Sequence, residues 1–401
     1  MADLFTPLML GGVTCPNRIQ VSPMCQYSAV DGIAQDWHLI HLGGLMMSGA
    51  GLVVAEATGV EAAGRISHGC LVLETDAQEQ ALADLVARLR PLSDAAIGIQ
   101  LGHAGRRASA RSIRDRGKGE SLPPEEGAWQ TYAPSALPYN DQWATPAEMT
   151  EADIIRVTRA FAQATRRAVR AGFDLVECHA AHGYLLHQFL SPRTNRRTDA
   201  WGGTLENRMR FPLAVVQAMR DALPADRALG VRVNSTDWHP QGATLEDAIP
   251  FVRALKDMGV DYVTLSAGNL VPDAVIPKAT PGHQVGFADR IRQETGMTVV
   301  AVGMISDPVQ ADAVVREGRA DMVAIGRAML DNPRWGWHAA ARLGRDVPYP
   351  PQYLRARPNN WTDFQRIHPG AQPVASTQQA DRPSGSTWDR PEADKPAAQP
   401  S

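Results

Sequence analysis

The chain has 401 residues, of which 44% are hydrophobic and 21% are charged, and its formal net charge is −3. This composition is typical of a globular protein with a substantial core, and the charge balance argues against bulk binding to nucleic acid or to a membrane surface. No window approaches the ~18 unbroken apolar residues of a membrane span, residues 1–12 show no secretory pattern, and no two cysteines form a Cys-x-x-Cys pair. We therefore expect a cytoplasmic protein that binds small molecules and no metal cluster.

Eight apolar runs predict eight β-strands. Most of the runs are continuously apolar rather than alternating, which is typical of parallel strands covered by helices on their outer face. In chain order they are residues 19–24, 51–57, 96–101, 173–178, 228–234, 260–266, 298–303 and 321–326.

Helical patterns lie between these runs, and several have suitable ends. Thr150 is a good N-cap before acidic residues, and Asp307 precedes a proline at the first helical position. Eight strand–helix units in series predict an α/β fold, the (β/α)₈ TIM barrel. The alternative is a doubly wound open sheet, but no GxGxxG follows the first strand. The helices are expected at residues 38–48, 78–89, 151–171, 205–222, 245–258, 288–294, 308–317 and 328–343.

Two segments fall outside this repeat. Residues 108–147 form a long loop after the third strand, and such loops on the carboxyl face of a barrel often shape the substrate entrance. We expect residues 1–357 to form the barrel domain. Residues 358–401 are rich in Pro, Ser and Gln, and they are expected to form a largely disordered tail. The alternative for Trp361 and Phe364 is local docking onto the barrel.

The most informative motif is His179-Ala-Ala-His182-Gly-Tyr184, which leaves the carboxyl end of the fourth predicted strand. Two imidazoles and a phenol at the carboxyl end of a strand are well suited to bind a polar atom by hydrogen bonds and to donate a proton to a ligand. If the segment winds helically, the two rings share a face and can reach one oxygen. The histidines are closer together than in the HExxH zinc motif and no glutamate lies between them, which argues against a metal.

Other strand ends carry candidates with open alternatives. Gly303, Gly326 and Arg327 follow the last two strands, where backbone N–H groups and a helix start can bind a phosphate, although such glycines often only make turns. Gln100 and Arg232 could face a flavin, or they could be a structural amide and an ion pair with Glu56 or Glu177. Cys25 could be a small buried apolar residue or a thiol that tunes a cofactor.

Taken together, these strings resemble the Old Yellow Enzyme family of flavin-dependent ene-reductases over about residues 4–357. The cysteine at position 25 and the second histidine are similar to the bacterial subgroup that includes xenobiotic reductase. The matching strings are LFTPL at 4–8, NRI at 17–19, SPMCQYS at 22–28, QLGHAGR at 100–106, HAAHGYLLHQFLSPRTNRRTDAWGG at 179–203, ENR at 206–208 and IGR at 325–327.

The resemblance implies a barrel that holds FMN at its carboxyl face and uses NADPH or NADH as hydride donor. It implies that His179 and His182 bind the substrate carbonyl oxygen beside Tyr27, and that Tyr184 donates the proton. Residues 350–357 resemble the family's C-terminal element, which can place an arginine in a neighbouring subunit's site, and Arg355 matches that arginine better than Arg357 does. The resemblance also implies a homodimer or homotetramer. The implied cofactor-binding residues are Ser22, Pro23, Met24, Cys25, Ala57, Gln100, Arg232, Gly303, Gly326 and Arg327.

The activity that the resemblance implies is reduction of the C=C bond in α,β-unsaturated carbonyls and related activated alkenes. Hydride passes from NAD(P)H to FMN and then to the alkene, in one shared cavity. The alternatives are a non-redox barrel lyase, which commonly needs a Schiff-base lysine or a metal, and a flavin-binding scaffold whose site has decayed. Lys256 and Lys278 do not end a predicted strand.

Overall fold

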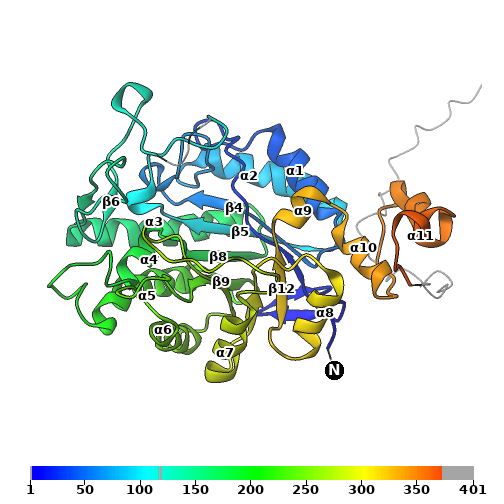
Figure 1. Cartoon of the computed structure of the whole chain (residues 1–401). Helices are drawn as coiled ribbons and strands as arrows, with labels where there is room; N and C mark the ends of the chain where they lie inside the picture. Colours follow the sequence, from blue (N-terminus) through cyan, green and yellow to red (C-terminus); the bar gives the residue numbers. More distant parts are fainter. Residues whose placement is uncertain (1, 116, 118–119, 373–401) are drawn as a thin grey trace, which may run out of the picture.

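The computed structural model describes residues 2–115, 117 and 120–372 of the chain. Eight parallel strands close into a barrel in the order β10-β11-β12-β3-β4-β5-β8-β9, and helices surround it (Figure 1). The predicted (β/α)₈ barrel is therefore confirmed. The strands are β3 (Ile19–Val21), β4 (Leu52–Gly59), β5 (Ala96–Gly102), β8 (Leu175–Ala180), β9 (Ala228–Asn234), β10 (Tyr262–Ser266), β11 (Val299–Ala301) and β12 (Met322–Ile325).

The helices begin where the chain supplies caps. Thr75 and Thr150 each accept a hydrogen bond from the backbone N–H three residues on, and Asp307 does the same before Pro308. The helices of the repeat are α1 (Asp36–Met46), α2 (Asp76–Leu89), α3 (Glu151–Arg170), α5 (Leu205–Ala222), α6 (Leu245–Asp257), α7 (Val285–Thr295) and α8 (Pro308–Arg316).

The last predicted helix, 328–343, is wrong as a single element. It divides into α9 (Arg327–Asp331) and α10 (Trp335–Arg342). Pro333 lies in the break. Proline has no N–H to continue the helical ladder, and it disfavours helical dihedrals at Asn332 before it. After the break, α10 runs in a different direction from α9, and the C-terminal residues pack against it.

A hairpin that the periodicity did not predict closes the amino-terminal end of the barrel. Its strands are β1 (Leu8–Leu10) and β2 (Val13–Cys15), which pair antiparallel. Leu10, Val13 and Cys15 are buried in one apolar cluster with side chains from seven of the eight barrel strands. Strands of three residues are too short to show a hydrophobic period, so the sequence did not predict this hairpin.

The long loop 108–147 rises beside the opposite end of the barrel (Figure 1). A short parallel pair, β6 (Tyr132–Ala133) and β7 (Ala147–Glu148), ties its later part together. Trp129 fixes it to the segment after β4, because its indole N–H donates to the carbonyl of Ala63 at 3.1 Å and the Arg65 guanidinium lies 4.6 Å from its ring centroid.

The C-terminal segment packs against α10 at the side of the barrel (Figure 1). Phe364, in the short helix α11 (Phe364–Ile367), is 2% exposed, and Gln372 donates a backbone hydrogen bond to Ala341 in α10. Residues 358–372 therefore do not belong to a disordered tail, and docking is the alternative that the structure shows for Phe364. Residues 373–401 of the expected tail lie outside the described residues.

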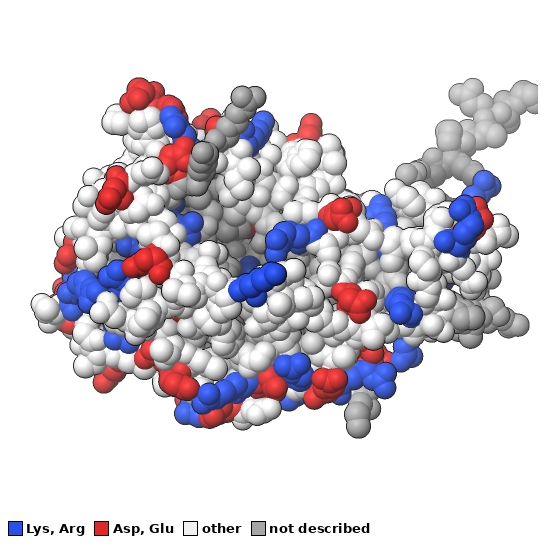
Figure 2. Space-filling model, viewed as in Figure 1, with Lys and Arg blue, Asp and Glu red and all other residues white. Residues whose placement is uncertain are grey.

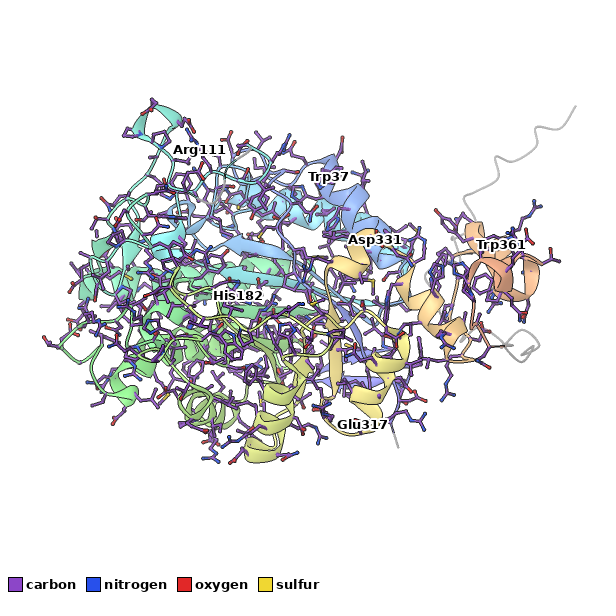
Figure 3. The ribbon with its side chains drawn as sticks, in the orientation of Figure 1. Trp37, Arg111, His182, Glu317, Asp331 and Trp361 are labelled. Atoms are coloured by element: carbon purple, nitrogen blue, oxygen red, sulfur yellow. The ribbon has the colours of Figure 1, made fainter. Side chains whose placement is uncertain are left out.

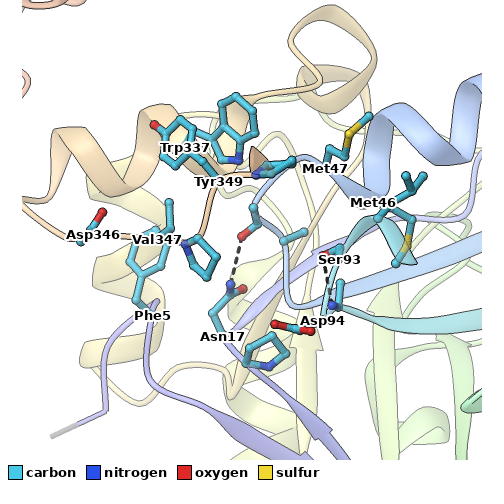
Figure 4. Close-up of a pocket in the computed structure, with 17 residues that line it drawn as sticks. Phe5, Asn17, Met46, Met47, Ser93, Asp94, Trp337, Asp346, Val347 and Tyr349 are labelled. Carbon is cyan, nitrogen blue, oxygen red and sulfur yellow. Dashed lines mark hydrogen bonds between the residues drawn. The ribbon is translucent and has the colours of Figure 1, made fainter. Parts of the chain in front are cut away.

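An apolar groove of about 180 Å³ opens beside the amino ends of the first barrel strands (Figure 4). One wall of the groove is formed by residues just before β3, β4 and β5, which are Asn17, Ala50 and Ala95. The other wall includes Trp337 and Tyr349 from the C-terminal part of the chain. The active sites of such barrels lie at the carboxyl ends of the strands, so this groove at the amino ends is a poor candidate for the catalytic site.

No described helix is long and apolar enough to cross a membrane.

The buried Phe364 ring gives a test of the C-terminal docking. Phe364→Ala removes contacts worth about 3–5 kcal/mol at a buried site, and we expect it to release the segment after α10 while the barrel stays folded. Limited proteolysis should cut the variant faster in residues 350–372, with an unchanged main thermal transition. Ile367→Ala, at a side chain that is 44% exposed, is the matched control. Equal cleavage of the two variants would contradict the docking.

Candidate active site

The predicted histidine pair lies at the carboxyl end of β8, in the middle of the barrel mouth. Figure 3 labels His182 there, and the space-filling view shows a hollow near the centre of the molecule with basic side chains at its rim (Figure 2). His179 belongs to β8 and is 3% exposed. The two ring centroids are 5.2 Å apart and the ring planes are nearly perpendicular, at 82°.

The segment after His179 is not helical, so the predicted route to convergence is wrong. His182 has φ 56° and Gly183 has φ 75°, which places two consecutive residues in the left-handed region. This reversal brings the His182 ring back towards His179. A side chain at Gly183 would place its Cβ 2.4 Å from the carbonyl oxygen of Asn269, so only glycine fits.

Side chains from three elements hold this turn. Arg107 donates through Nη1 to the carbonyl oxygen of His182 at 2.9 Å. The N–H of Gly183 donates to His187 Nδ1 at 2.9 Å, and Gln188 donates to the carbonyl oxygen of Gly183 at 2.7 Å. His187 is in turn fixed by Asp237, at 2.7 Å. These groups leave the turn little freedom, so the two imidazoles are positioned before a ligand arrives.

Both imidazoles of the pair are neutral at neutral pH. Burial lowers the pKa of His179 and of His182 well below the ordinary value, and the positive charge of Arg232 lowers both further. His179 Nδ1 accepts a hydrogen bond from the backbone N–H of Ala181 at 3.2 Å. The proton of its ring is therefore on Nε2, which makes that atom a hydrogen-bond donor.

Two tyrosines of the site remain protonated: Tyr184 beside His179, and Tyr27 within electrostatic reach of Tyr184. Tyr184 is the N-cap residue of α4 (Leu185–Leu190), and its ring centroid lies 4.8 Å from that of His179. Burial raises the pKa of both Tyr184 and Tyr27 far above neutral pH. The Arg107 guanidinium, 5.7 Å from the Tyr184 ring centroid, acts in the opposite direction. Either phenol can thus donate a proton.

A buried carboxylate, Glu177, organises the centre of the barrel. Gln100 donates to its Oε1 and Thr264 donates to its Oε2, each at 2.7 Å. The amide N–H of Gln100 is thus engaged by Glu177, and its amide oxygen stays available to a bound group. Burial lowers the pKa of Arg232, and the charge of Glu177 opposes that shift. Arg232 Nε is buried without a hydrogen-bond partner in the described protein, so this donor calls for an acceptor from a bound group.

The backbone after β12 leaves room for a ligand at Gly326, where a Cβ would meet only Met24 Sδ at 3.6 Å and Ser22 Cβ at 3.9 Å. Gly303, after β11, has φ 115°, and a Cβ there would lie 3.0 Å from Gln284, so this position requires glycine for its own conformation and packing. Arg327 is exposed at the start of α9. Open backbone at Gly326, the Arg327 guanidinium and the unpartnered Arg232 Nε together fit a planar anionic group with a phosphate tail, as in FMN.

The segment with Cys25 is fixed by a residue pair that the sequence did not single out for this role. Glu56 accepts a hydrogen bond from the N–H of Gln26 at 2.9 Å, and His38 Nε2 lies 3.2 Å from Glu56. Burial raises the pKa of Cys25 well above the ordinary value, and the neighbouring Cys70 and Glu56 raise it further. The thiol therefore stays protonated, which argues against a nucleophile. Pro23 and Ala57 are partly exposed in the same wall.

Some functional positions were missed. Arg107, His187 and Ser266 support the histidine turn, but nothing in their spacing marks them, because they come from three separate strand–helix units. His187 lies in α4, and its ring supports the turn by accepting from the N–H of Gly183. Arg355 is exposed in the C-terminal segment that follows the groove residues Tyr349 and Pro350, away from the histidine pair of its own chain.

Glu61 links the site to the outer helices. It contacts His103 Nε2 at 3.0 Å and forms an ion pair with Arg156 of α3. The carbonyl oxygen of His103 in turn accepts from the N–H of Leu185, next to Tyr184. Burial tends to raise the pKa of Glu61, but the hydrogen bonds and charges of His103 and Arg156 lower it to about 2.

Comparison with known proteins gives a consistent family. The profile described as NADH:flavin oxidoreductase / NADH oxidase family matches residues 3–345. NADPH dehydrogenase of Geobacillus thermodenitrificans is 44% identical over 354 residues, which is 88% of this chain and 98% of that protein. NADPH dehydrogenase of Listeria monocytogenes serotype 4a is 43% identical over 358 residues, 89% of this chain and 99% of that one.

Solved structures agree with these relatives. Morphinone reductase superposes with a TM-score of 0.71 at 30% identity, covering 88% of this chain and 92% of that chain. A 2-naphthoyl-CoA reductase complex superposes with a TM-score of 0.76 at 26% identity, covering 86% of this chain and 52% of that chain.

The Glu61 cluster predicts a pH-dependent stability. A carboxyl with a depressed pKa stabilises the fold above its ordinary value of 4.5, and this contribution is lost as the pH falls towards about 2. We expect Glu61→Gln to lower the free energy of unfolding at neutral pH by up to about 3 kcal/mol, with the deficit shrinking below pH 4.5. Urea unfolding across that range measures it.

Glu126→Gln is the control for this experiment, because Glu126 pairs with Arg111 on the surface and should contribute little. A deficit for Glu61→Gln that stays constant down to pH 2 would contradict the assigned cause.

Proposed function

This chain belongs to the NADH:flavin oxidoreductase / NADH oxidase family, as its resemblance to the Old Yellow Enzymes predicts, and we propose that it reduces the C=C bond of α,β-unsaturated carbonyl compounds and related activated alkenes. The family and the NADPH dehydrogenase relatives make it an NAD(P)H-dependent oxidoreductase with FMN as cofactor. The observation that carries the proposal is the pair of neutral imidazoles, His179 buried and His182 partly exposed, with a protonated phenol against His179.

The two imidazoles suit a carbonyl oxygen. Negative charge grows on that oxygen when a hydride reaches the β-carbon of an enone, and fixed N–H donors stabilise it in a site that excludes water. His179 offers its Nε2–H, and His182 lies beside it. Cationic histidines would bind anions instead, but burial keeps these rings neutral. The pair therefore favours neutral carbonyl compounds as substrates.

Tyr184 is the proposed source of the α-proton. The phenol is protonated at neutral pH because burial raises its pKa, and it stands edge-on to His179, next to the atoms that hold the carbonyl oxygen. Tyr27 is the proposed neighbour on the other side of the substrate. The Arg107 charge partly offsets the effect of burial on Tyr184 and so eases proton release.

FMN, when bound, would supply the hydride chemistry that links NAD(P)H to the alkene. Arg232 and Gln100 are proposed to hold its ring edge, while Ser22, Pro23, Met24, Cys25 and Ala57 form the wall against it. Gly303, Gly326 and Arg327 are proposed to hold the phosphate. We also propose that the protein works as a homodimer or homotetramer in the cytoplasm, with Arg355 completing the substrate site of a neighbouring subunit.

The proton donor can be tested by anaerobic stopped flow with cyclohexenone. We expect Tyr184→Phe to slow reoxidation of the reduced enzyme by at least about 100-fold, because general acid catalysis contributes this much. Flavin reduction by NADPH should change little, since that step needs no proton from the phenol. Equal slowing of both half-reactions would contradict the role of Tyr184.

The carbonyl grip can be tested without turnover. Phenols such as p-hydroxybenzaldehyde place an oxygen where the substrate carbonyl binds, and the titration is followed by a charge-transfer absorbance with the flavin. We expect His179→Ala to raise Kd by about 10- to 100-fold, since it removes a buried donor to a charged oxygen. His338→Ala, on α10 outside the barrel, is the control. An unchanged Kd for His179→Ala would refute the proposal that His179 binds the carbonyl oxygen.

A further inference from the structure

Ser266, at the end of β10, touches the second histidine of the site. Its Oγ lies 2.7 Å from His182 Nε2, and its side chain is almost completely buried. The backbone holds it firmly, because Ser266 pairs with Asn234 in the barrel register and Asn234 accepts from the His182 N–H at 3.4 Å. The hydroxyl therefore faces the ring from a fixed position.

The chemistry of this contact depends on a single proton. A neutral imidazole carries one N–H, so His182 can donate from Nδ1 or from Nε2 but not from both. If the Ser266 hydroxyl donates to Nε2, the ring proton is on Nδ1. If the hydroxyl accepts from Nε2, then Nδ1 carries a lone pair and can only accept.

The distances favour the first arrangement. Within the described part of the chain, the other hydrogen-bond partner of the Ser266 hydroxyl is Gln284 Oε1 at 3.5 Å, which is too long for a good O–H···O hydrogen bond. The hydroxyl proton therefore goes to His182. No hydrogen bond of the described residues involves His182 Nδ1, so its N–H remains for a ligand.

We propose that Ser266 is a positioning residue, which fixes the proton of His182 on Nδ1 and so makes this ring a hydrogen-bond donor to the substrate oxygen. The inference rests on the proposed function. His179 reaches the same end differently, because its Nδ1 accepts from the backbone of Ala181 and its Nε2 donates. The two rings thus present N–H groups from different ring atoms, in keeping with their perpendicular planes.

The direct test is nitrogen NMR of the FMN-loaded enzyme with ¹⁵N-labelled histidine, with the spectrum of His182→Asn used to assign the signals. We expect a protonated Nδ1 and an unprotonated Nε2 for His182. A protonated Nε2 would overturn the proposal. This readout needs only the wild-type ring, so it does not depend on whether a Ser266 variant folds.

Ligand affinity gives a second readout. Ser266→Ala should raise the Kd of p-hydroxybenzaldehyde about tenfold, and Ser266→Thr, which keeps the hydroxyl, should restore it. Ser235→Ala is the matched control, because Ser235 is also buried near the pair but its hydroxyl has no partner in the described structure. Equal losses in the Ala and Thr variants, or no loss in either, would overturn the role of the hydroxyl.

The two proposals fail separately. Wild-type enzyme that does not reduce enones refutes the proposed function, whatever the protonation of His182. An enzyme that reduces enones while His182 is protonated on Nε2 refutes only the role of Ser266.

Discussion

The left-handed turn at His182 and Gly183 determines where the two imidazoles and the Tyr184 phenol lie. A residue with a side chain costs roughly 1–2 kcal/mol in this conformation, and the surrounding contacts must offset it. Arg107, His187 and Gln188 do so with hydrogen bonds to the backbone of the turn. The positions of the rings therefore depend on supporting groups: Arg107, which follows β5, and His187 and Gln188 of α4.

Burial favours the uncharged form of the two imidazoles, the two phenols and the Cys25 thiol at this site. It keeps the imidazoles neutral and the phenols and the Cys25 thiol protonated, as the shifts of His179, Tyr184 and Cys25 show. Among these neutral groups, Arg232 interacts electrostatically with Glu177, and Arg107 adds a second guanidinium beside Tyr184. A site of this kind stabilises charge that develops during a reaction more strongly than charge already present, because its donors are preorganised and water is scarce.

Sequence reasoning succeeded where the signal is periodic or local. The eight apolar runs predicted the eight barrel strands, and cap residues such as Thr150 located helix starts within one or two residues. Sequence reasoning failed where contacts between residues far apart in the chain determine the backbone conformation. The course of the chain after His179 depends on Arg107 and Asn269, which are far away in sequence, and the two strands of the amino-terminal hairpin are too short to show a period. Pro333 was a readable signal for a helix break that the predicted element nevertheless ignored.

The amino-terminal hairpin has a consequence for the order of assembly. Residues 8–15 precede every strand against which they pack, and their apolar partners extend as far as Met322 and Ala324 in β12. During synthesis these residues leave the ribosome first, yet they can find their full set of neighbours only after the last strand has been made. The hairpin therefore stabilises the closed barrel, and it contributes little to the stability of a barrel that still lacks its last strands.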